Sequence, residues 1–298
     1  SRDNEGSLAA FPAETLRQLA LENPPESALT AASKQPTARH WLAARQIWQA
    51  GGSDNTQALF AHLLAPQQPL PAIKPEPTLR LRVGQRELSD AAAWGKASQL
   101  GLKAEPTVVV LDLANMDGGP PAALCRQIEA NGQACVQVLT RWGGASREVL
   151  ERLPELIAPA HAAALVVLQD FVVGAAEGRE AVGEAFKKLD VPIFKAIRLN
   201  ERTATQWRLS PDGLPADSVQ YRVALPGLQG IGQPIVVSAL GAARPDKLTG
   251  IESRPPVVLG AEVDRLAARV GRWLALRGKA NRDKRVAVIY YNHPPGRQ

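Results

Sequence analysis

Several polar and aromatic side chains follow apolar, strand-like runs and could line one binding crevice. They are Asn115 and Asp117 after residues 107–113, Arg141 and Trp142 after residues 134–140, and Asp170 after residues 162–168. The carboxyl ends of parallel strands meet at one edge of a sheet, and α/β proteins bind their ligands at this edge. We therefore predict a ligand crevice there. Glycine and aspartate are also common in turns, so loop composition explains the pattern almost as well.

A second candidate site lies at the end of the sequence. The apolar run of residues 286–290 predicts a strand buried on both faces, and the prolines after it cannot extend its hydrogen-bond ladder. The loop that follows consists of Asn292, His293, Pro294, Pro295 and Gly296. We expect this loop to form part of a binding site. The His293 imidazole could ligate a metal ion or transfer a proton, or it could simply hydrogen-bond its own backbone.

Motifs for phosphate binding and for nucleophilic catalysis are missing from the sequence. The glycines Gly227, Gly230 and Gly232 do not have the spacing of the dinucleotide fingerprint, and no G-x-x-x-x-G-K-[ST] loop occurs. No Ser-His-Asp or Cys-His arrangement can be assembled either. We therefore do not expect this chain to bind ATP, and we assign no catalytic residue.

The elements that must position these residues follow an alternating pattern. Strands are expected at residues 107–113, 134–140, 162–168, 192–199, 219–225 and 234–239, and helices at 121–131, 147–157, 178–189 and 261–277. Such alternation predicts an α/β fold with a doubly wound, mainly parallel sheet. Before it, helical patterns at 37–50 and 55–64 flank Gly51 and Gly52 and predict an N-terminal helical hairpin.

Composition divides the chain into four expected segments. Residues 1–65 are expected to be helical, 66–105 to be a Pro-rich linker or crossing segment, 106–258 to be the doubly wound α/β domain, and 259–298 to be the helix and first strand of a truncated second α/β domain. A length of 298 residues with 45% hydrophobic residues suits about two globular domains.

Charge and cysteine content narrow the function classes. The net charge of +6 is concentrated after Gly260, but no interleaved aromatic residues or nucleic-acid-binding module accompany it, so we expect no nucleic-acid partner. No apolar run approaches the roughly 20 residues needed to cross a bilayer. Cys125 and Cys135 form no C-x-x-C motif, and we expect small buried side chains rather than a disulfide.

Three separated stretches resemble one protein family, the large subunits of cobaltochelatase and of magnesium chelatase. Residues 47–64 resemble its "GG-x-x-N" helix corner, with Gly51, Gly52 and Asn55 at the matching positions. Residues 213–238 are similar to its segment around "VALPE-x-DG", and residues 272–295 are similar to "W-x-x-L…KRVAIILYNYPP". The order and spacing of these stretches agree with the family across residues 36–298.

The resemblance implies that this chain is an N-terminal head-region fragment of a very large subunit. That subunit binds a tetrapyrrole for insertion of a divalent metal, with cobalt favoured over magnesium, while two ATPase-type partner subunits hydrolyse Mg-ATP. The family's catalytic residues are expected beyond Gln298, so the fragment is expected to be inactive alone. The resemblance places the loop from Asn292 to Gly296 nearest the tetrapyrrole.

Two alternatives remain open from the sequence. One is a relative that binds haem or a corrin, or removes its metal, without ATPase partners and in a periplasmic or otherwise exported compartment. The other is a stand-alone α/β module that binds a small molecule. If the chain is instead the head region of a chelatase large subunit, we expect a cytoplasmic protein.

Overall fold

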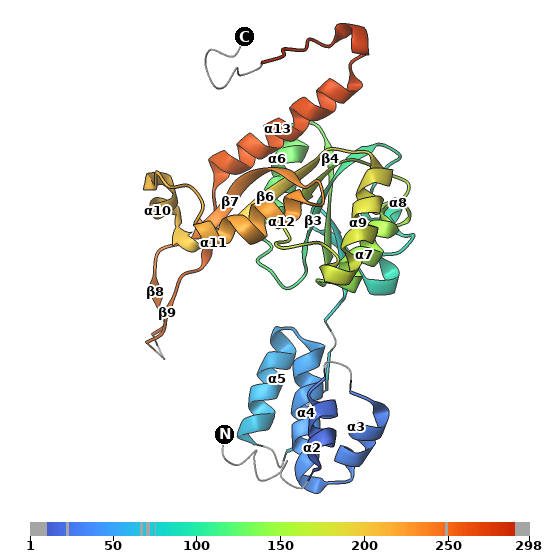
Figure 1. Cartoon of the computed structure of the whole chain (residues 1–298), viewed down its shortest axis with the longest axis vertical. Helices are drawn as coiled ribbons and strands as arrows, with labels where there is room; N and C mark the ends of the chain where they lie inside the picture. Colours follow the sequence, from blue (N-terminus) through green and yellow to red (C-terminus); the bar gives the residue numbers. More distant parts are fainter. Residues whose placement is uncertain are drawn as a thin grey trace, which may run out of the picture. The chain divides into compact units, whose positions relative to one another are not determined.

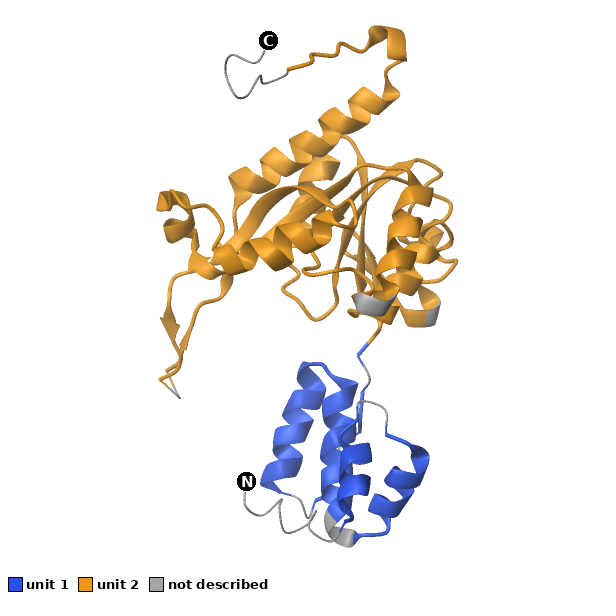
Figure 2. Ribbon diagram, viewed as in Figure 1, with its two compact units in different colours: residues 1–76 blue, residues 77–298 orange. Residues whose placement is uncertain are grey.

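The chain forms two compact units, residues 1–76 and residues 77–298 (Figure 2). The computed structural model describes residues 11–21, 24–65, 68–69, 72–74, 76–247 and 250–289. Each unit has its own hydrophobic core.

The first unit is helical. It contains α2 (Ala13–Leu19), α3 (Glu26–Ser33), α4 (Pro36–Ala50) and α5 (Ser53–Leu64). Leu19, Ala28 and Ala32 form its buried core, and the partly buried Trp41 packs against them. The predicted helical hairpin is confirmed as α4 and α5, which pack against each other.

The corner between α4 and α5 explains the Gly-Gly-x-x-Asn pattern. Gly51 and Gly52 have φ angles of 70° and 84°, which favour residues without a Cβ atom. Asn55 is 2% exposed. Its amide nitrogen donates to the carbonyl oxygens of Gly51 (2.7 Å) and Lys74 (2.5 Å), and its amide oxygen accepts from the Lys74 nitrogen (3.0 Å). Asn55 therefore fastens the corner to the segment that leaves the unit.

The second unit is built on an eight-stranded sheet (Figure 1). Its strands are β1 (Leu79–Val83), β2 (Arg86–Ser89), β3 (Pro106–Leu113), β4 (Ala134–Thr140), β5 (His161–Val167), β6 (Ile193–Thr203), β7 (Gly232–Leu240) and β10 (Pro256–Val258). The spatial order is β10-β7-β6-β5-β3-β4-β1-β2. A separate small hairpin pairs β8 (Arg244–Pro245) with β9 (Glu252–Ser253).

The five central strands are parallel and have the order β4-β3-β5-β6-β7. Numbered along the chain, this is the 2-1-3-4-5 order of flavodoxin-like sheets, in which the direction of winding reverses between the first and third strands. The reversal here lies between β3 and β5. The expected fold class, a doubly wound and mainly parallel α/β sheet, is confirmed.

Helices cover both faces of this sheet (Figure 1). The helices of the second unit are α6 (Gly119–Ala130), α7 (Gly144–Glu151), α8 (Leu153–Leu156), α9 (Ala175–Leu189), α10 (Ala204–Leu209), α11 (Ala216–Val219), α12 (Leu225–Gly227) and α13 (Gly260–Gly278). Val108 and Val110 pack in the core beneath α6 and α13, whereas Val109 and Leu111 pack in the core beneath α7 and α9. This alternation along β3 is the two-residue period of a strand covered on both sides.

The segment expected to be a Pro-rich linker, residues 66–105, contains two strands of the main sheet. The hairpin of β1 and β2 adds to the sheet because β1 pairs with β4 in the antiparallel direction. Leu79 and Leu81 are buried, whereas the residues between and after them are only partly buried. The prediction of a linker is therefore wrong for residues 79–89. The alternation of apolar and charged residues in Leu79–Val83 indicates a strand, although prolines precede it.

The strand expected at residues 219–225 is helical instead. The α11 helix, a π-helix at Gln220–Ala224 and α12 run continuously from residue 216 to residue 227. Apolar residues stand at every second position from Val219 to Leu225, as in a strand, but the buried residues are Ser218, Arg222 and Pro226. Their spacing of four is helical, and two of them are polar, so hydrophobicity alone gave the wrong period.

The strand expected at residues 286–290 is absent from the described residues 284–289. Val286, Val288 and Ile289 are 84%, 84% and 94% exposed. The preceding α13 packs Val263, Leu266 and Val270 on the sheet of the second unit, so this helix belongs to that core. A second α/β domain after α13 stays a prediction.

No helix in the described residues combines the length and apolar character needed to span a membrane.

The two cysteines correct another expectation. Cys125 on α6 and Cys135 on β4 are buried, as predicted, but they form a disulfide rather than two free thiols. Their Cα atoms are 5.3 Å apart because α6 returns directly over the strand that follows it. The sequence gives no signal for this pairing, because the two cysteines are 10 residues apart and form no known disulfide motif.

Replacing both Cys125 and Cys135 with Ala should lower the free energy of unfolding. A cross-link restricts the unfolded chain, and for a separation of 10 residues the expected loss is a little under the roughly 3 kcal/mol of a 15-residue loop. Urea denaturation with and without reductant measures it. Reductant should shift the midpoint of the original protein but not that of the double variant, and equal midpoints in all four samples would contradict the disulfide.

Candidate functional site

A cavity of about 350 Å³ opens where β3 and β5 end, at the point where the winding of the sheet reverses. Its lining residues are Asp112, Leu113, Met116, Trp142, Leu168, Gln169, Asp170, Phe171 and Arg198. These residues come from the ends of β3, β4 and β5 and from β6. Ligand sites of doubly wound sheets occur at this position.

Two of the five predicted crevice residues, Trp142 and Asp170, line this cavity. The other three, Asn115, Asp117 and Arg141, are not among the lining residues. Asp117 is exposed, and its carboxylate accepts a hydrogen bond from the Gly119 nitrogen at 3.0 Å. The cavity thus lies at the predicted edge of the sheet, and a ligand role for Trp142 and Asp170 stays a prediction.

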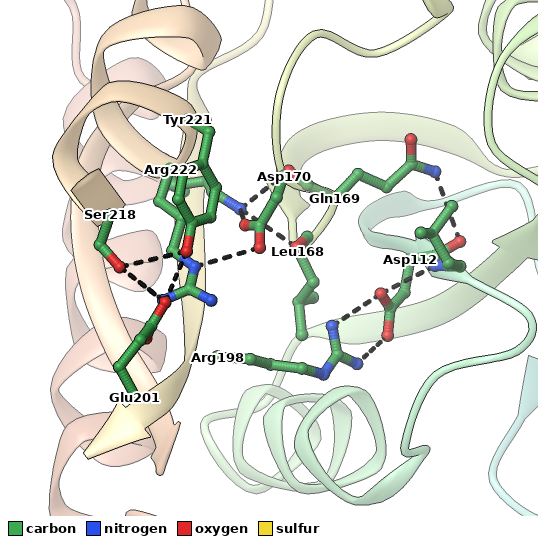
Figure 3. A network of polar contacts seen from close by, with 11 residues as sticks. Asp112, Leu168, Gln169, Asp170, Arg198, Glu201, Ser218, Tyr221 and Arg222 are labelled. Atoms are coloured by element: carbon green, nitrogen blue, oxygen red, sulfur yellow. Dashed lines mark hydrogen bonds and ion pairs between the residues drawn. The ribbon is translucent and has the colours of Figure 1, made fainter.

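Two of the lining residues, Asp112 and Arg198, form a buried ion pair. Figure 3 shows this pair. Both terminal nitrogens of Arg198 on β6 bind the two carboxylate oxygens of Asp112 on β3, with Nη1 to Oδ1 at 2.8 Å. β5 lies between these two strands, so the pair passes across its carboxyl end. Burial raises the pKa of Asp112, and the hydrogen bonds and charge of Arg198 oppose this effect.

A fully buried lysine holds the neighbouring loop. The Lys195 ammonium on β6 donates to the carbonyl oxygens of Leu168 (3.1 Å) and Gln169 (2.8 Å) and to the Asp170 carboxylate (2.9 Å). These three acceptors use all three of its hydrogens. Burial lowers the pKa of Lys195, and the charge of Asp170 opposes the shift. Lys195 thus fixes the turn that follows β5.

Arg222 joins this turn to the π-helix (Figure 3). Its Nε donates to the second oxygen of Asp170 (3.1 Å), and its Nη1 donates to Glu201 (2.6 Å) and to the Ser218 hydroxyl (2.8 Å). Burial alone would raise the pKa of Glu201, but hydrogen bonds from Arg222, Tyr221 and Ser218 together lower it to about 2. Asp170 therefore accepts from two cations, one on each side.

Phe171 sits at the end of the same turn in a strained backbone conformation. Its φ angle is 60°, which is uncommon for a residue with a side chain. Its nitrogen donates to the Tyr221 carbonyl oxygen at 2.7 Å, and the two rings stack with centroids 5.1 Å apart. The Phe171 side chain is still 50% exposed and lines the cavity. The contacts with Tyr221 hold the Phe171 ring at the cavity rim.

Sequence reasoning did not select Asp112, Lys195 and Arg198. All three lie inside strands that their apolar residues predict, whereas the predicted crevice residues lie in the loops after the strands. A charged residue within a strand buried on both faces was the available signal, since such a charge needs a partner nearby.

Neither unit contains a recognisable metal centre within the described residues. No group of three or more His, Cys, Asp and Glu side chains there could hold a metal ion. The second predicted site, Asn292 to Gly296 with His293 as a candidate metal ligand, lies outside the described residues. Its role stays a prediction.

Replacing Lys195 with Met should destabilise the second unit strongly. The change leaves two buried carbonyl oxygens without their donor and removes one of the two cations bound to Asp170, so we expect a loss of about 3 kcal/mol. Chemical denaturation measures it. Lys187→Met is the matched control, because the Lys187–Glu184 pair lies on the surface and should contribute little. A Lys195→Met protein as stable as the control would contradict the role of Lys195.

Glu201 should make stability depend on pH. Its folded pKa of about 2 lies below the ordinary value of 4.5, so its contribution is complete above pH 4.5 and decreases as the pH falls toward 2. The destabilisation caused by Glu201→Gln, measured by denaturation at several pH values, should therefore shrink below pH 4.5. Glu129→Gln is the control of opposite sign. Because burial raises the pKa of Glu129, this substitution should stabilise the protein at neutral pH rather than destabilise it. A pH-independent effect of Glu201→Gln would exclude this explanation.

Several sequence relatives of the chain are magnesium-chelatase subunits. A chloroplastic magnesium-chelatase subunit ChlH from Oryza sativa is 25% identical over 296 residues, which cover 88% of this chain and 20% of the relative. A magnesium-chelatase subunit from Rhodobacter capsulatus is 25% identical over 290 residues, covering 86% of this chain and 23% of the relative. The chain thus spans about a fifth of the length of these relatives.

A solved structure shares the fold. The catalytic subunit of cobaltochelatase from Mycobacterium tuberculosis superimposes with a TM-score of 0.57 and 24% sequence identity, covering 89% of this chain and 22% of that chain. The family model described as CobN/Magnesium Chelatase matches residues 45–298, which include the helix corner at Asn55 and the whole cavity edge. The chain belongs to the CobN/magnesium chelatase family.

Proposed function

We propose that this chain is the N-terminal head region of a metal chelatase large subunit, which binds a tetrapyrrole so that a divalent metal ion can be inserted. The observation that carries the proposal is the family match across residues 45–298. Several relatives are named magnesium-chelatase subunits, and a protein that shares the fold is the catalytic subunit of a cobaltochelatase. The metal ion is a substrate in this reaction. We favour cobalt, with magnesium as the alternative.

The energy for metal insertion comes, in this proposal, from partner subunits. The sequence has no phosphate-binding loop of the G-x-x-x-x-G-K-[ST] type, so ATP hydrolysis by this chain has no support. Two ATPase-type subunits that hydrolyse Mg-ATP are the expected partners. The residues that perform insertion are expected outside this chain, and the head region supplies a supporting wall with the Asn292 to Gly296 loop close to the macrocycle.

One observation favours a second candidate, a relative that binds haem or a corrin, or removes its metal, in an exported compartment. The disulfide between Cys125 and Cys135 suits an oxidising environment better than the reducing cytoplasm that the first proposal assumes. Such a protein would act without ATPase partners. The two candidates therefore differ in their need for ATP.

Titration of the complete subunit with a metal-free porphyrin and a metal-free corrin tests the proposal. We expect the Soret-region spectrum to change on binding, and a further change when cobalt, the ATPase subunits and Mg-ATP are added together. Metal insertion or removal without ATP would support the second candidate. A complete subunit that leaves both spectra unchanged would contradict both candidates, and would leave only a binding module for another small molecule.

A further inference from the structure

We infer that the cavity between β3 and β5 binds a flat, largely apolar ring. This inference rests on the proposed function, because the ring is then one edge of the tetrapyrrole macrocycle. Nothing in the family match assigns this cavity, and it lies within one compact unit of the chain. Its place at the reversal of the sheet is the position where doubly wound folds bind ligands.

The lining has the chemistry of a ring site. Five of the nine lining residues are apolar or aromatic: Leu113, Met116, Trp142, Leu168 and Phe171. Among them, Met116, Trp142 and Phe171 are 39%, 52% and 50% exposed, so their side chains are open to a ligand. Large exposed apolar side chains gathered at one cavity usually mark a binding surface. A ring bound there would cover apolar surface that now faces water.

The two aromatic residues are placed to contact the ring from different strands. Trp142 follows β4 and Phe171 follows β5, and these strands lie on either side of β3 in the sheet. Aromatic rings attract each other in offset-stacked and edge-to-face arrangements. Phe171 is already held in place by its backbone hydrogen bond and its stacking with Tyr221. A ligand therefore meets at least one aromatic wall that needs little ordering.

Charge defines which part of the ligand enters. Arg198 is paired with Asp112, and Lys195 and Arg222 share Asp170. Each of these three cations is thus already paired with a carboxylate. The cavity favours an uncharged ring edge, and the carboxylate substituents of the tetrapyrrole should stay in solvent. Its volume of about 350 Å³ is near the lower end of the about 300–1,000 Å³ of drug-sized sites, so only part of a macrocycle fits.

Binding of a metal-free, carboxylate-bearing porphyrin to this chain tests the inference. Two-dimensional amide NMR detects weak binding and locates it by residue. We expect shifts at Leu113, Trp142 and the turn from Leu168 to Phe171. Trp142→Ala and Phe171→Ala should each weaken binding about 3- to 10-fold, in line with the energy of an aromatic pair. Raising the salt concentration should change the affinity less than about twofold, because the buried edge carries no charge.

Trp273→Ala is the matched control, since Trp273 is 40% exposed on α13 and does not line this cavity. Its binding should equal that of the original chain. Three results would overturn the inference: no binding to this chain, equal binding by the Trp142 and Phe171 variants, or an equal loss in the Trp273 variant. If the complete subunit still binds the porphyrin in any of these cases, the proposed function stands and only this location is wrong. If the complete subunit does not bind it either, the proposed function fails.

Discussion

Charge matching at the carboxyl edge of the sheet is the constraint on which the rest of the second unit depends. Lys195, Arg198 and Arg222 are all nearly or fully buried, and Asp112, Asp170 and Glu201 are their partners. A buried charge without a partner is strongly destabilising, whereas a matched pair adds little stability of its own. What the network supplies is geometry, since each ion pair joins two different segments of the chain.

This geometry determines what the edge can bind. Because the polar groups are satisfied by one another, the surface left for a ligand consists mainly of Trp142, Phe171, Met116 and two leucines. The turn after β5 is fixed by Lys195 from one side and by Arg222 from the other, and Phe171 extends from that turn. This rigid polar frame with an apolar opening is the geometry on which the proposed ring site rests.

The sequence predicted the parts whose signals are local. Apolar runs such as TVVVLDL and ACVQVLT, each followed by a helical pattern, were sufficient to predict β3, β4 and a mainly parallel sheet. The errors arose where distant residues decide the outcome. Residues 219–225 are helical, and Arg222 on this helix pairs with Asp170 and Glu201. Residues 79–83 form a strand that pairs with the edge of β4. For the cavity, the sequence indicated Trp142 and Asp170, but the charges inside the strands became meaningful only when their partners were known.

The pairing of Asp112 with Arg198 across the end of β5 has a consequence for how this family can evolve. The two residues are 86 positions apart in the sequence, yet a change at either one alone leaves the other charge stranded in the protein interior. Such a lineage must pass through an unstable intermediate or change both sites nearly together. In homologues of this unit, the two positions should therefore vary together, either as an acid with an arginine or as two uncharged residues.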